Sequence, residues 1–93
     1  FKYDYMSIYK VHNLREGSRN DNWLAYWENA TGIEANRCHK LGCTQHATDG
    51  AHVQLDNSND KRWYVVPLCH KCNCQFGEHF LVEGPLVSVI APT

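Results

Sequence analysis

Two pairs of closely spaced cysteines are the residues of this chain best suited to chemistry. Cys38 and Cys43 form the first pair, and Cys69 and Cys72 form the second. Each spacing is typical of a tight turn that directs two thiolates toward one point, and Gly42 allows the first turn to close. Two such pairs build a closed tetrahedral site in which the protein supplies all four ligands. The sequence therefore predicts one structural Zn²⁺ bound by these four cysteines.

The chain has five cysteines, so one thiol remains after the two pairs are assigned. An odd count and a Cys-x2-Cys spacing argue against the disulfide framework of small secreted domains. We expect Cys74 to be the remaining thiol and to be buried as a small apolar side chain. Zinc-bound cysteines predict a reducing compartment, so the expected localisation is cytoplasmic.

Composition predicts one small domain over residues 1–93. The chain is 43% hydrophobic, but its apolar residues are divided among short elements, which allows only a modest core. A structural zinc ion contributes about 10–16 kcal/mol of apparent binding energy, more than the net stability of most small domains. We therefore expect the metal-free chain to be poorly folded. No apolar run approaches the roughly 20 residues that span a bilayer, so no membrane partner is expected.

Hydrophobic patterning predicts an α+β fold around the cysteines. Alternating, aromatic and β-branched residues favour strands, which we expect at 7–11, 51–55, 62–68 and 86–90. A short helix is expected from Cys72 to about Gly77. The zinc module would thus occupy about residues 37–79.

Aromatic residues define a longer helix before the first cysteine pair, over about residues 19–31. Trp23 and Trp27 lie one turn apart on a broad apolar face, and Gly32 is suited to end the helix. Two tryptophans at this spacing could stack on nucleic-acid bases, but aromatic residues in such a stripe more often pack in a core. We expect this helix to pack on the zinc module.

The order of these elements resembles a known fold family. A cysteine turn, a strand carrying His52, a second strand, and a Cys-x2-Cys pair opening a helix follow one another as in a treble clef. Residues 49–53 (DGAHV) and 65–73 (VVPLCHKCN) make the chain similar to zinc-containing members of the HNH (ββα-metal) endonuclease superfamily. The resemblance covers under half of the chain. It implies a zinc-stabilised treble-clef module, here with an added N-terminal helix and C-terminal strand.

The resemblance also implies a hydrolytic site beside the zinc. In this family a histidine near the end of the first hairpin strand is the general base that activates water, and His52 matches that position. Asn73 matches a ligand of a second divalent ion, Mg²⁺ or Mn²⁺, which an amide oxygen suits. Ala51 stands where family members often have a metal-binding Asp or His. Asp49 or His79 would have to supply the missing ligand.

Two functions remain open on this reasoning. One is a metal-dependent DNA endonuclease that hydrolyses phosphodiester bonds with His52 as base. The other is a noncatalytic zinc module that binds nucleic acid or protein, which is favoured by Ala51 and by Tyr64 standing near the place of the family's central Asn. A net charge of −1 does not favour tight nonspecific binding of nucleic acid, because phosphate contacts need lysine and arginine. We expect the basic residues near the cysteines to form a solvated face: Arg37, Lys40, Lys61, Arg62 and Lys71.

Overall fold

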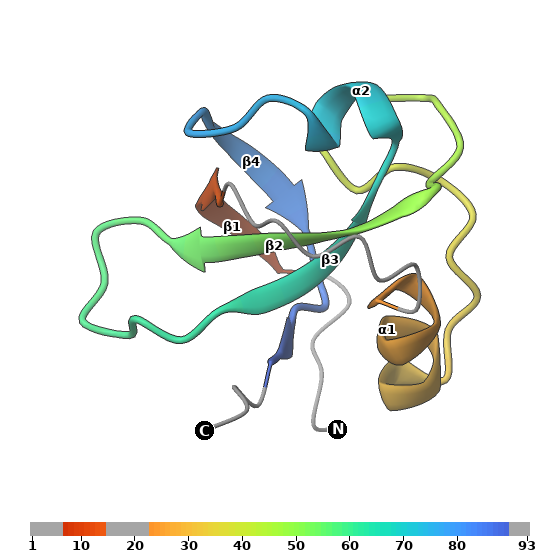
Figure 1. The fold of residues 1–93 in the computed structure, drawn as a ribbon, viewed down its shortest axis with the longest axis horizontal. Helices are drawn as coiled ribbons and strands as arrows, with labels where there is room; N and C mark the ends of the chain where they lie inside the picture. The colour runs from red at the N-terminus through yellow and green to blue at the C-terminus, as the bar shows by residue number, and fades with distance from the viewer. Residues whose placement is uncertain (1–6, 15–22, 90–93) are drawn as a thin grey trace.

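A computed structural model describes residues 7–14 and 23–89 of the chain. Within these ranges it has an α+β fold, in which one antiparallel sheet has the strand order β4-β1-β2-β3-β5 (Figure 1). The elements are β1 (Ile8–Asn13), α1 (Trp23–Thr31), β2 (Asp49–Leu55), β3 (Tyr64–Leu68), α2 (His70–Asn73), β4 (His79–Glu83) and β5 (Val87–Ser88). No helix in these ranges is long and apolar enough to cross a membrane.

The central hairpin agrees with the sequence prediction. β2 and β3 pair antiparallel, with Asp49 opposite Leu68 and His52 opposite Val65. β3 contains an aromatic residue and two adjacent valines, and most of its side chains are buried, as expected for a strand at the centre of a small core. The last strand, which was predicted over residues 86–90, is shorter than expected. β5 contains only Val87 and Ser88.

The segment after the second cysteine pair differs from the prediction. α2 begins at His70 and ends at Asn73, rather than running from Cys72 to about Gly77. Gly77 has a φ of 77°, a conformation suited to a turn, and β4 begins two residues later. β4 was not predicted, although it alternates buried Phe80 and Val82 with exposed neighbours. It pairs antiparallel with β1, the first strand of the described residues.

α1 packs on the face of the sheet that is formed by β2, β3 and β5. Trp27 is fully buried there, and its indole N–H donates a 2.9 Å hydrogen bond to the carbonyl of Pro85. Gly50 permits the close approach, because a Cβ at that position would lie 2.5 Å from the carbonyl carbon of Trp23. The helix ends as predicted, with Gly32 following at a φ of 74°. Its expected beginning, at residues 19–22, lies outside the described residues.

We expect Trp27→Phe to destabilise the protein, because the substitution removes a buried hydrogen bond and leaves the Pro85 carbonyl without its indole partner. The predicted loss is about 1–3 kcal/mol in the free energy of unfolding. Urea denaturation of the metal-loaded protein at constant m-value measures it. Trp63→Phe is the matched control, since Trp63 is 38% exposed and should change stability by less than about 0.5 kcal/mol. Equal effects of both substitutions would contradict this account of the α1 packing.

Candidate metal centre

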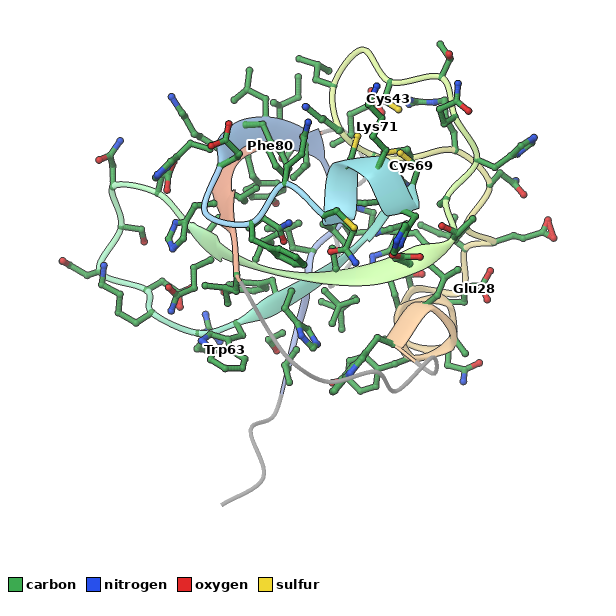
Figure 2. The ribbon with its side chains drawn as sticks, turned by 45° about the horizontal axis from the view of Figure 1, so that its top comes forward. Glu28, Cys43, Trp63, Cys69, Lys71 and Phe80 are labelled. Atoms are coloured by element: carbon green, nitrogen blue, oxygen red, sulfur yellow. The ribbon has the colours of Figure 1, made fainter. Side chains whose placement is uncertain are left out.

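Four cysteines from two separate turns converge beside α2. Their sulfur atoms all lie within 4.8 Å of one another, and Cys43 Sγ lies 4.0 Å from the Sγ atoms of Cys69 and Cys72. In a tetrahedral zinc site with Zn–S bonds of about 2.3 Å, the sulfur atoms are about 3.8 Å apart. Figure 2 shows Cys43 and Cys69 next to each other at the α2 end of the molecule. The four cysteines could therefore hold a structural metal such as zinc.

The backbone of each of the two turns directs its pair of sulfur atoms toward the centre of the cluster. In the first turn the amide of Cys43 donates to the carbonyl of Lys40 at 3.0 Å, and Gly42 has a φ of 87°. In the second, Cys69 is the N-cap of α2, and its sulfur accepts the amide of Cys72 at 3.5 Å. Such N–H groups stabilise negative charge on a thiolate, which is the form of cysteine that binds metal.

The sulfur atoms differ in their surroundings. Burial raises the pKa of the Cys38 and Cys72 thiols. A hydrogen bond from the backbone of Gln45 lowers the pKa of Cys43, which is the most accessible of the four. Several thiolates would repel one another in so small a space, and a divalent cation supplies the compensating charge.

Cys74 does not join the cluster, and the expectation that it is buried was wrong. Its side chain is exposed, with Sγ 3.4 Å from Nε2 of His70. The reason is the short α2, which ends at Asn73 and leaves Cys74 at its C-terminal cap rather than on a packed helical face.

Asp49 and Asn73, two of the residues expected near a second metal ion, lie in direct contact. Asp49 Oδ2 accepts a hydrogen bond from Asn73 Nδ2 at 2.9 Å and lies 2.9 Å from Nδ1 of His70. Burial raises the pKa of Asp49, but its hydrogen bonds with Asn73 and His70 outweigh that effect and lower it. Asp49 precedes Ala51 by two residues, so both side chains belong to the same face of β2.

His52 occupies the opposite face of that strand. Its ring packs edge-on against Trp23 of α1, with centroids 4.7 Å apart, and lies 6.2 Å from the ring of Trp63. The side chain is only 6% exposed. Ala51 instead belongs to the core group that contains the buried cysteines. His52 therefore faces α1, while Asp49 and Asn73 meet at α2. Figure 1 shows these two helices on opposite sides of the β2–β3 hairpin.

His79 meets a different set of residues from Asp49 and Asn73. Its Nδ1 lies 2.8 Å from Oδ2 of Asp56, and the other oxygen of Asp56 lies 2.7 Å from Nδ1 of His12. Sequence reasoning assigned no role to His12 or to this group. The pairing of β1 with β4 places His12 opposite His79, so recognising 79–83 as a strand was the signal that could have revealed it.

The basic residues near the cysteines do not gather beside His52. Arg37 forms an ion pair with Glu83, and Arg62 forms one with Asp60. Lys40 and Lys71 instead line an open depression of about 360 Å³ beside the cysteine cluster, together with Leu41, Gly42, Gln45 and Gln75. Figure 2 shows Lys71 close to Cys43 and Cys69, with Trp63 at a distance from them. This lining contains no carboxylate.

No protein-family model, curated protein or solved structure matches this chain.

We expect Cys69→Ser to abolish tight binding of metal to the cluster and to lower the fraction of folded protein, because one of the four thiolate ligands is lost while the serine hydroxyl can still cap α2. Cys74→Ser is the matched control and should retain about one zinc per cysteine cluster. Substitution with Co²⁺ provides the measurement, since cobalt–thiolate absorption reports the cysteine site specifically. A native far-ultraviolet circular dichroism spectrum from chelator-treated, metal-free protein would contradict a structural role for the metal.

Proposed function

We propose that this chain is a zinc-stabilised module of treble-clef type that binds nucleic acid and does not hydrolyse it. The four-cysteine cluster supports the zinc assignment. The order of a cysteine turn, the β2–β3 hairpin and α2 supports the treble clef. The observation that carries the functional part is the orientation of His52, which packs against Trp23 on the face of β2 away from Asp49 and Asn73.

Hydrolysis with His52 as base demands a different arrangement. A general base must lie within about 2.6–3.2 Å of the attacking water, or reach it through one further water. That water must also be close to the divalent ion that polarises the phosphate. A metal ion held by Asp49 and Asn73 would be separated from the imidazole by the sheet. His52 therefore serves as a packing residue between α1 and the hairpin.

Nucleic acid is the proposed partner because of the depression lined by Lys40 and Lys71. Phosphate groups are attracted by lysines at a site without carboxylates. The two arginines in the described part of the chain, Arg37 and Arg62, do not line the depression and are already paired with acidic residues. A four-thiolate zinc site carries a formal charge of −2, which two lysines only offset. The proposed binding is therefore weak. Most of its affinity comes from contacts with the phosphates of the nucleic-acid backbone.

We expect Lys71→Ala to weaken binding of a fluorescein-labelled DNA oligonucleotide, because one phosphate contact is lost. Fluorescence anisotropy at several salt concentrations measures the effect. The slope of log K against log[salt] should become shallower by about 0.9 for duplex DNA. Lys61→Ala removes the same charge from the β2–β3 loop and should have no such effect. Equal weakening by both variants, or no binding by the wild type, would contradict the proposed nucleic-acid site.

A second candidate, a metal-dependent endonuclease, is favoured by one specific contact. Asp49 lies 2.9 Å from Asn73, on the strand face where Ala51 has replaced the usual metal-binding residue. A carboxylate and an amide oxygen suit Mg²⁺ or Mn²⁺ as ligands. In this function Asp49 would supply the missing ligand, and α1 would have to move for His52 to reach a water molecule on that ion.

Plasmid nicking separates the two candidates. With Mg²⁺ or Mn²⁺ present, we expect the zinc-loaded protein to produce no nicking above that of the His52→Ala variant. Nicking by the wild type that is lost in Asp49→Ala and His52→Ala variants with native circular dichroism would establish the endonuclease and overturn our proposal. Nicking of equal rate in all variants would show a contaminating nuclease, which a further purification step removes before the comparison is repeated.

A further inference from the structure

We propose that His12, Asp56 and His79 form a second metal site, which takes a divalent transition ion such as Zn²⁺. The site is separate from the cysteine cluster and from Asp49, because Asp56 follows the last residue of β2 whereas Asp49 is its first. Together the three residues offer two imidazoles and a carboxylate, with all three ligand atoms within 4.8 Å of one another.

Three strands bring these side chains together. His12 in β1 and His79 in β4 are direct cross-strand partners, and their ring centroids lie 5.4 Å apart. Asp56 enters from the end of β2, where its backbone amide donates to the carbonyl of Lys10 at 2.9 Å. The sheet therefore fixes the backbone of all three residues without any contribution from an ion.

The ligand chemistry selects the kind of metal. Imidazole nitrogens suit Zn²⁺, Ni²⁺, Co²⁺ and Cu²⁺, whereas Mg²⁺ and Ca²⁺ prefer sites made of oxygen ligands alone. Ligands about 2.1 Å from a tetrahedral ion are about 3.4 Å from one another. Nδ1 of His12 lies 2.7 Å from Asp56, so binding requires these groups to separate by about 0.7 Å. His79, whose side chain is 59% exposed, has room to turn toward the ion.

Gln54 gives His12 the orientation of a metal ligand. The amide nitrogen of Gln54 donates to the carbonyl of Lys61 at 2.7 Å, which leaves the amide oxygen 3.1 Å from Nε2 of His12. Nε2 must therefore carry a hydrogen and donate it to that oxygen. Metal-binding histidines almost always make such a bond with their other ring nitrogen. In the neutral ring, Nδ1 then directs its lone pair at the Asp56 carboxylate, an arrangement that a cation between them stabilises.

Burial gives the site a closed side and an open side. The Asp56 side chain is 9% exposed, that of His12 is 29% exposed, and His79 lies at the surface. The carboxylate is thus mostly withdrawn from solvent, and in the described part of the chain its ion-pair partners are these two histidines. Three protein ligands leave at least one position for water, unlike the closed four-cysteine site. A bound ion would connect the edge strand β4 to β1 and to the end of β2.

The test is calorimetric titration of Ni²⁺ into Cys74→Ser protein loaded with a single equivalent of Zn²⁺ (the zinc-loaded protein). One equivalent fills the tighter four-cysteine cluster and leaves the His12, Asp56 and His79 site empty. The exposed thiol is absent in this variant. We expect one further binding event. A further His79→Ala substitution should lower the affinity for Ni²⁺ more than tenfold and leave the zinc content of the cysteine cluster unchanged. Gln54→Ala keeps all three ligands and should weaken it by about 10–100-fold, as loss of a partner that orients a metal ligand does. His46→Ala removes an exposed histidine elsewhere and is the matched control.

Three results would overturn the proposal: no nickel binding by the zinc-loaded protein, binding that His79→Ala leaves unchanged, and binding that His46→Ala weakens equally. Far-ultraviolet circular dichroism of each variant confirms that it is folded. If His79→Ala fails to fold, His79→Gln replaces it, because a glutamine can retain a polar contact with Asp56 but is a poor ligand for nickel. Retention of tight nickel binding by a folded His79→Gln variant would also reject the site.

Discussion

The convergence of four sulfur atoms is the constraint on which the rest of this small fold depends. One cysteine pair precedes β2 and the other follows β3, so the ends of the hairpin must lie together if the sulfurs are to meet. The register satisfies this requirement: Asp49 pairs with Leu68, and the amide of Thr48 donates to the Leu68 carbonyl just before Cys69. A metal ion bound by the four cysteines would therefore stabilise the register of the hairpin, which matters in a chain with a modest apolar core.

The pleat of β2 then decides which chemical groups can act together. Successive side chains of a strand face opposite sides, so adjacent positions along β2 are divided between α1 and α2. His52 is buried against Trp23, while Asp49 contacts Asn73 and His70 beside the cysteines. Residues that resemble a nuclease motif in the sequence thus lie on opposite faces of β2, in two different environments. This division is the physical basis for proposing binding rather than hydrolysis.

β2 begins with one aspartate, Asp49, and is directly followed by another, Asp56, and each of them contacts histidine. Asp49 contacts His70 near the cysteine cluster, and Asp56 contacts His12 and His79 where β1, β2 and β4 come together. The second group has the ligands of a transition-metal site and a glutamine that orients one of them. A metal ion in each of the two groups would stabilise the sheet near both ends of β2, in a protein whose core has few large side chains.

The sequence by itself determined the cysteine cluster, the α+β class and the central hairpin, because these depend on local spacing and on alternation within short segments. It also indicated the end of α1 at Gly32, where a positive φ follows from glycine chemistry. Only the tertiary structure decided that α2 stops at Asn73, that Cys74 is exposed and that residues 79–83 form a strand, since pairing with β1 competes successfully with extension of a helix. The meeting of His12 with His79 likewise depends on strand pairing across a long sequence distance. The separation of His52 from Asp49 instead follows from the alternation of side chains along β2. Local patterns indicate where strands lie, but not which distant strands become neighbours in the sheet.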